Sequence, residues 1–221
     1  MGSKLPPLTS TLLASLVADS SSSSPALLSA LQTLEPRAQI TTLDPTSSDV
    51  LSTFYASYIL ALLLCDDLPE ARALSHRIDA QILHNDPAVI SAYRVLQALW
   101  SKDYITFHQT MQNAPWGEVT AILASQVLQK HRTSTLNLLS TAYTSLPPSL
   151  AQKYLGVSDE PRTVKMLTEE NPQSGFWFNA TKGFLVIPEG AKPGINARAG
   201  NKATEGEIGR LAGLGGFLSD M

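Results

Sequence analysis

Cysteine is nearly absent from this sequence, which carries only Cys65 among its 221 residues. A single cysteine excludes an intramolecular disulfide framework and cannot build a zinc cage, and it is typical of a reducing compartment. Cys65 ends the apolar run YILALLLC, residues 58–65, so we expect a buried structural thiol rather than a nucleophile.

Long hydrophobic runs are also missing. The longest one, residues 58–65, is far too short to cross a bilayer. The segment LLASLVA follows Lys4 and could pass for a secretory signal, but Pro6 and Pro7 interrupt that pattern. We therefore expect a soluble intracellular protein without a membrane partner.

A basic excess is lacking as well. The 16 lysines and arginines are outnumbered by 19 aspartates and glutamates, which gives a formal charge of −3. Proteins that bind nucleic acid non-specifically usually carry a positive excess. The charge balance therefore argues against a general nucleic-acid binder.

Motifs for chemistry are absent too. The four histidines, His76, His84, His108 and His131, fall on separate predicted helices without metal-ligand spacing. The sequence has no phosphate-binding glycine loop and no nucleophile elbow. We predict no catalytic residue, no cofactor and no metal site, and we interpret the histidines as exposed or hydrogen-bonded helix residues.

Helical patterns fill the first half of the chain. The spacing of apolar residues predicts helices over 9–18, 25–34 and 48–65, with loops at the serine run 20–24 and around Pro36 and Pro45. The body of the third helix, VLSTFYASYILALLLC, is apolar nearly all round, which places it at the centre of a helical stack.

A possible repeat follows this helix. Asp67-Leu68 and Asp103-Tyr104 each come directly after an apolar helix, and they are 36 residues apart. Asp67 has capping-box spacing to Glu70, and another helix begins at residues 85–87. Because this offset is near the period of helix-pair repeats, we predict stacked antiparallel helix pairs.

From Pro115 the pattern changes. We predict helices over 116–128 and 133–146, a short helix closed by Gly156, and a helix over 160–170. The stretch FWFNATKGFLVIP, residues 176–188, is rich in aromatic and β-branched residues and predicts a hairpin with its turn near Gly183. Three helices followed by a hairpin predict a winged helix, in which Trp177 or Phe178 fills the gap beneath the strands.

This winged helix has an acidic helix in front of its hairpin. Residues 159–170 carry four carboxylates against two basic side chains. Because lysine and arginine supply most of the affinity for the phosphates of DNA, this balance argues against a helix that reads DNA.

The carboxyl-terminal segment has a composition of its own. Residues 189–204 resemble a linker, whereas 205–221 regain an apolar stripe opposite a row of glycines. The stripe consists of Ile208, Leu211, Leu214, Phe217 and Leu218. Each glycine costs a helix about 1 kcal/mol relative to alanine, so we expect this helix to form only when a partner covers its apolar side.

A specific resemblance begins at APWGEVTAILASQVLQKHRTSTLNLLSTAYTSL, residues 114–146. The same pattern continues in KYLGVSDE and in the hairpin FWFNATKGFLVIP, and it is preceded by LLLCDDLPEARALSHRI. This combination of segments is similar to the PCI family, whose members are found in the proteasome lid, the COP-nine signalosome and translation initiation factor three. Within that family it most resembles the subunit-eight family of the signalosome, over roughly residues 50–190. The sister families are the smallest PCI subunit of the lid and the k subunit of the initiation factor.

The resemblance implies a mostly α fold. Residues 1–114 would form helix-pair repeats of the TPR or HEAT kind, and 115–188 a winged-helix (PCI) subdomain with a β-hairpin wing. Residues 189–204 would be a flexible linker, and 205–221 a helix for a bundle shared with partners.

The resemblance also implies a structural role in the cytoplasm and nucleus. The signalosome removes a ubiquitin-like modifier from cullin–RING ligases, and its chemistry lies in a different, zinc-bearing subunit. This chain would be a non-catalytic scaffold that binds other PCI subunits through its winged helix and its terminal helix. The candidate contact residues are Phe176, Trp177 and Phe178 in the wing and Ile208, Leu211, Leu214 and Leu218 in the tail.

Three classes of function stay open from the residues alone. They are an assembly subunit, a winged helix that binds nucleic acid, and an enzyme whose site follows no known motif. The wing aromatics likewise stay open between domain core and interface.

Overall fold

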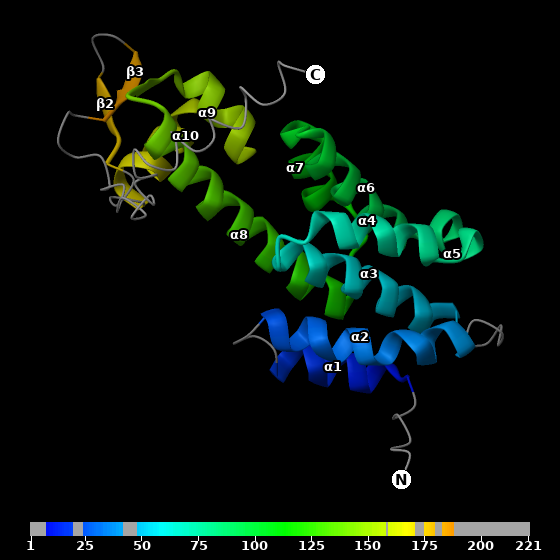
Figure 1. The fold of residues 1–221 in the computed structure, drawn as a ribbon. Helices are drawn as coiled ribbons and strands as arrows, with labels where there is room; N and C mark the ends of the chain where they lie inside the picture. Colours follow the sequence, from blue (N-terminus) through cyan, green and yellow to red (C-terminus); the bar gives the residue numbers. More distant parts are fainter. Residues whose placement is uncertain are drawn as a thin grey trace, which may run out of the picture.

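The fold is mostly helical, with one small antiparallel sheet (Figure 1). The structure is a computed structural model that describes residues 8–19, 24–41, 48–157, 159–170, 175–179 and 183–187. Its helices are α1 Ser10–Asp19, α2 Ser24–Thr41, α3 Ser48–Leu64, α4 Leu68–Arg77, α5 Ala80–Asn85, α6 Pro87–Ser101, α7 Tyr104–Asn113, α8 Glu118–Ala142, α9 Pro148–Leu155 and α10 Glu160–Lys165, which continues as a π-helical turn, Met166–Glu170. Its strands are β1 Ser145–Leu146, β2 Trp177–Asn179 and β3 Phe184–Val186. Within the described residues, no helix combines the length and the apolar character needed to span a bilayer.

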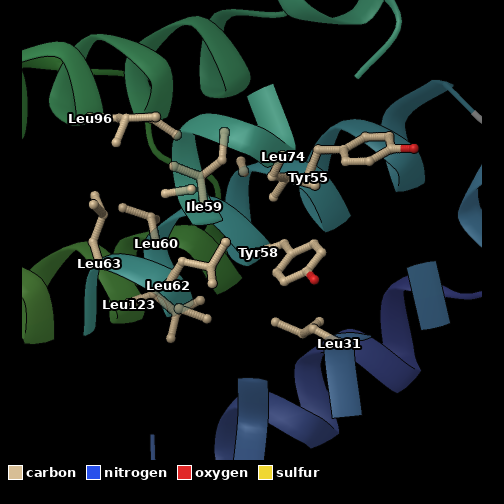
Figure 2. Packing of buried hydrophobic residues seen from close by; sticks show 14 of the residues in the cluster. Leu31, Tyr55, Tyr58, Ile59, Leu60, Leu62, Leu63, Leu74, Leu96 and Leu123 are labelled. Atoms are coloured by element: carbon tan, nitrogen blue, oxygen red, sulfur yellow. The ribbon is translucent and has the colours of Figure 1, made fainter. Parts of the chain in front are cut away.

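Helix α3 is the centre of the first core, as its all-round apolar sequence predicts. Thirteen of its 17 residues are buried, and it packs against α2, α4, α6 and α8. Figure 2 shows its side chains pointing in several directions, with Tyr58 toward Leu31 of α2 and Leu62 toward Leu123 of α8. Burying one such leucine stabilises a fold by about 1.5–3 kcal/mol, so this helix anchors the first half of the chain.

The two predicted repeat turns have the same geometry. Asp66 and Lys102 both adopt a left-handed backbone with φ of 59°. The next residues, Asp67 and Asp103, donate their N–H groups to the carbonyl five residues earlier, at 3.0 and 2.8 Å. Each aspartate also accepts a hydrogen bond from the N–H three residues ahead and so caps the helix that follows. The 36-residue offset therefore marks two equivalent helix-to-helix turns, α3–α4 and α6–α7.

Helix α2 differs from the prediction, which ended it at Leu34 and placed Pro36 in a loop. The helix continues through Pro36 to Thr41. A proline inside a helix costs roughly 3 kcal/mol because it removes a hydrogen bond and clashes with the preceding turn. Here the buried stripe of Leu31, Leu34 and Ala38 extends past the proline, and its packing offsets that cost. The prediction was wrong because it weighed the local signal alone.

Helix α8 also differs from the prediction, which divided residues 116–146 into two helices. It is one helix of 25 residues that runs from the first core toward the sheet (Figure 1). Its first half places Leu123 and Val127 in the first core, whereas Leu136 and Leu139 belong to a second core. Residues 129–132, the gap between the two predicted helices, are helical and lie between the two cores.

The second core joins the end of α8 to the sheet. It consists of Leu136, Leu139, Leu146, Ala151, Leu155, Leu167, Phe176, Leu185 and Ile187. The short helix α9 ends at Gly156 with φ of 64°, as predicted, and the predicted hairpin pairs β2 with β3. The third strand, β1, was missed, because two extended residues between a helix and Pro147-Pro148 give no strand signal.

Candidate protein-interaction surface

The register of the sheet decides which side chains face out. The strand order is β1-β3-β2, with Trp177 opposite Val186 and Asn179 opposite Phe184. Side chains directly opposite each other lie on the same face, and alternate residues of a strand share that face. Phe178, Leu185 and Leu146 therefore face the second core, and Trp177, Asn179, Phe184, Val186 and Ser145 form the other face. We call this second set the outer face.

The outer face exposes two aromatic rings. Trp177 is 47% exposed and Phe184 is 40% exposed, although both are large apolar side chains. Leu185 follows Phe184 in β3 but lies on the opposite face, and it is completely buried. Exposed aromatics that share one face of a sheet are typical of a surface that another protein covers. Phe184 was used in the sequence analysis only as a strand former. Because successive side chains of a strand point to opposite faces, the pair Phe184 and Leu185 could have indicated that one of the two is exposed.

The three wing aromatics separate in the structure. Phe176 is 5% exposed and belongs to the second core, whereas Phe178 packs against that core and is partly buried. The prediction that Trp177 or Phe178 fills the gap beneath the strands is wrong for Trp177, which points to the outer face. Phe176, which lies just before β2, takes the buried role instead.

The predicted tail contacts lie outside the described residues. Ile208, Leu211, Leu214 and Leu218 belong to 188–221, a range for which the structure describes nothing. The linker 189–204 and the terminal helix 205–221 therefore remain predictions.

A cluster of rings connects the two cores. The His131 ring of α8 lies 4.5 Å from Phe107 and 5.7 Å from His108 of α7, measured between ring centroids. The Tyr104 ring contacts the same histidine at 5.5 Å and Tyr154 of α9 at 5.4 Å, both in tilted arrangements. His108 Nε2 lies 3.0 Å from the Tyr154 carbonyl and donates a hydrogen bond to it. These contacts fix the sheet-bearing second core relative to the helical first core.

Burial controls the protonation of this cluster. It lowers the pKa of His131 to about 4, with smaller effects from the nearby His108 and Arg132. Burial also lowers the pKa of His108 below its ordinary value, although the bond to Tyr154 opposes this. Within the described residues, Nδ1 of each histidine is buried without a hydrogen-bond partner. Both rings are therefore neutral at pH 7.

The other histidines and the cysteine lie outside this cluster. His76 and His84 are exposed on their helices, and Cys65 is partly buried rather than fully buried as predicted. Burial raises the pKa of the Cys65 thiol, which disfavours the reactive thiolate. Among the described residues, no group of three histidine, cysteine or carboxylate side chains lies close enough to hold a metal ion.

Comparison with known proteins identifies the family. The model of the CSN8/PSMD8/EIF3K family matches residues 49–193 of this chain. The chain belongs to this family. The matched range begins in α3 and includes α4–α10 and all three strands, so the family match spans the core around α3, the ring cluster and the outer face.

Three relatives from different organisms share the name COP9 signalosome complex subunit 8. COP9 signalosome complex subunit 8 of Emericella nidulans is 26% identical over 172 residues, which cover 77% of this chain and 78% of the relative. Subunit 8 of Xenopus tropicalis is 26% identical over 166 residues, covering 75% and 81%. Subunit 8 of Arabidopsis thaliana is 25% identical over 110 residues, covering 50% and 56%.

Proposed function

We propose that this chain is a non-catalytic assembly subunit of the COP9 signalosome, which removes a ubiquitin-like modifier from cullin–RING ligases. The observation that carries the proposal is the similarity to COP9 signalosome complex subunit 8 from several organisms, over three quarters of the chain in two of them. The family as a whole also includes subunits of the proteasome lid and of initiation factor three, which are the alternative assignments. The non-catalytic role rests on the resemblance, which assigns the chemistry to another, zinc-bearing subunit.

The proposed architecture is that of a PCI module. The two equivalent turns support helix-pair repeats in residues 1–114, and α8, α9, α10 and the antiparallel sheet support a winged helix in residues 115–188. The outer face with Trp177 and Phe184 would then be a contact with a neighbouring PCI subunit. Phe178, which is partly buried, would support that face from beneath, as would the buried Phe176.

The terminal helix supplies the second proposed contact. The stripe of Ile208, Leu211, Leu214 and Leu218 would pack into a bundle with the terminal helices of other subunits. Its glycines make the helix unstable alone, which is expected of a segment that folds on binding. We place the protein in the cytoplasm and nucleus, where the resemblance puts this complex.

Affinity capture tests the proposed function. The tagged full-length chain is expressed in its own cells and captured, and mass spectrometry quantifies the proteins that accompany it relative to a tag-only control. The proposal predicts strong enrichment of the other signalosome subunits. Enrichment of proteasome-lid or initiation-factor subunits instead would assign the chain to a sister branch of the family.

Removing residues 205–221 tests the tail separately. The shortened chain should recover less of the same complex, because it lacks one of two contact surfaces. An unchanged recovery would remove the tail from the proposal and leave the outer face as the principal contact.

A further inference from the structure

A groove of about 340 Å³ lies between α4 and α6. The two helices pack against each other (Figure 1). Within the described residues, the lining of the groove comes from these two helices. Leu96, only 2% exposed, contributes apolar surface to the groove, and Trp100 is a 49% exposed ring beside it. The groove therefore combines the apolar surface of a buried leucine, Leu96, with the accessible ring of Trp100.

The charged group of this groove is Arg72. Its guanidinium carbon lies over the Trp100 ring, 4.8 Å from the ring centroid, which is a cation–π contact. Such a contact uses the charge of the guanidinium rather than its N–H groups, and a guanidinium can bind a carboxylate with two parallel hydrogen bonds. The ring also limits the motion of the guanidinium, which lowers the entropy lost on binding.

Arg72 lacks the partners that the neighbouring arginine has. One turn later on α4, Arg77 pairs with Glu35 at 2.9 Å and with Glu70 at 2.8 Å. Within the described residues, no carboxylate lies within ion-pair distance of Arg72, and no carboxylate lines the groove. The Arg72 guanidinium therefore contacts the Trp100 ring and carries a positive charge that no carboxylate of the described residues neutralises.

From these contacts we infer that the groove between α4 and α6 binds an acidic peptide segment of a partner protein. One carboxylate binds the guanidinium of Arg72, and a neighbouring apolar side chain packs on Leu96 and Trp100. The side-chain amide of Gln97, also in the lining, can bind the peptide backbone. The Ser101 hydroxyl already donates to the Gln97 carbonyl at 2.9 Å, so it can only accept a hydrogen bond from the peptide. The charge of the groove selects this occupant, because its one fixed charge is positive and its other lining groups are neutral or histidine.

The inferred groove is separate from the contacts of the proposed function. It lies on α4 and α6, whereas the outer face belongs to β2 and β3 and the tail follows both. Binding is measured on the isolated full-length chain, so a failure here leaves the proposed place in the signalosome untouched. Nucleic acid fits the groove less well, since one arginine neutralises little phosphate charge and the chain is net negative.

The experiment uses the three tryptophans as reporters. Trp100 lies in the groove, Trp177 on the outer face, and the Trp116 indole donates a hydrogen bond to the Met111 carbonyl. The ¹⁵N-labelled chain is titrated to millimolar concentration with acidic hexapeptides that carry a central leucine, phenylalanine or tryptophan. Peptides in which every carboxylate is replaced by its amide are the controls. The inference predicts a saturable shift of the Trp100 indole signal with the acidic peptides only.

Substitutions then test the assigned contact. Arg72→Gln should weaken the affinity for a fluorescein-labelled acidic peptide about tenfold, because it removes a charge-assisted pair of hydrogen bonds. Arg72→Lys keeps the charge but loses the planar fork, and it should give an intermediate loss. Arg162→Gln removes the same charge from an exposed position on α10 and should leave the affinity unchanged.

Five results would overturn the inference. Three concern the peptides: no saturable shift of Trp100 with any acidic peptide, equal binding of the amide controls, or a response of Trp177 in place of Trp100. The fourth is a short oligothymidine that binds at Trp100 more tightly than the acidic peptides do. The fifth is a Trp100 signal that moves with protein concentration alone, which would assign the groove to a second copy of the chain.

Discussion

The His108 ring of α7 fills the space where a side chain on Gly156 would stand. A Cβ on Gly156 would lie 2.1 Å from Cγ of His108, and Gly156 has a left-handed φ of 64°. The same histidine donates a hydrogen bond to the Tyr154 carbonyl. The end of α9 can therefore approach α7 this closely only because residue 156 has no side chain.

Replacing Gly156 with alanine should destabilise the protein by about 2–5 kcal/mol, since the left-handed backbone costs about 1–2 kcal/mol and the overpacked contact about 1–3 kcal/mol. Gly183→Ala is the matched control. Gly183 also has a positive φ, 67°, but no described atom lies within 4 Å of a Cβ there. Its cost should stay near 1 kcal/mol. Urea unfolding measures both, and equal losses would contradict the close approach of His108.

The buried histidines predict a loss of stability in mild acid. In the folded state the pKa of His131 is about 4, whereas in the unfolded chain it is near the ordinary value of about 6.5. Below about pH 6.5 the unfolded state binds the extra proton, so stability falls as the pH drops from 6.5 toward 4. His131→Phe keeps a ring in the cluster but cannot titrate.

Urea midpoints at pH 7.5 and pH 5 measure this effect. The midpoint of the wild-type chain should fall between the two pH values, and that of His131→Phe should fall less. His76→Phe, which changes an exposed histidine, should retain the wild-type pH dependence. The same pH dependence in all three proteins would contradict a buried neutral His131.

The two repeat turns should respond equally to loss of their caps. Asp67→Ala and Asp103→Ala each leave a helix N-terminus without its side-chain acceptor, and each should cost about 1 kcal/mol. The asparagine variants at both positions retain a capping oxygen and should cost much less. Thermal or urea unfolding measures the losses, and a large loss at only one site would show that the turns are not equivalent.

The wing aromatics should differ sharply in their contribution to stability. Phe176→Ala removes a buried ring from the second core and should cost about 3–5 kcal/mol. Trp177→Ala removes a ring that is 47% exposed and should cost far less in the isolated chain. Urea unfolding of both variants measures this contrast. A larger loss of stability from the Trp177 substitution would mean that Trp177, rather than Phe176, is buried in the second core.

Much of this fold could be predicted from local sequence signals. The apolar body of α3, the capping aspartates of α4 and α7, the glycine after α9 and the hairpin all lie where the residues indicated. Each of these signals acts over a few residues, either through a hydrogen bond to a nearby N–H or through the period of apolar side chains. Local chemistry was therefore enough for them.

The errors arose where distant packing decided the outcome. Helix α2 continues through Pro36 because Ala38 is buried beyond it, and α8 continues through the polar stretch at 129–132. Within that stretch, Lys130 donates hydrogen bonds to the Leu64 carbonyl and to Asp66, both 2.5 Å away, and Arg132 donates one to the Leu155 carbonyl at 3.3 Å. These partners are 23 to 66 residues away in the chain, so no local pattern could reveal them.

The candidate site was predicted only in part for the same reason. The hairpin was visible in the sequence, but the choice of face for Trp177 depends on its register against Val186. A shift of one residue would have exchanged the buried and exposed aromatics. The groove at Arg72 required the side-by-side placement of α4 and α6, and it had no sequence signal.

The most direct test of the central claim is capture of partner subunits by a chain whose outer face is altered. Trp177→Ser combined with Phe184→Ser removes the exposed rings, and Ile40→Ser, which changes a 66% exposed isoleucine on α2, is the control. All the variants are first checked for an unchanged urea midpoint. The account predicts that the double variant recovers much less of the signalosome subunits than the wild-type chain or Ile40→Ser does. Equal recovery by all three would contradict an assembly role for this face.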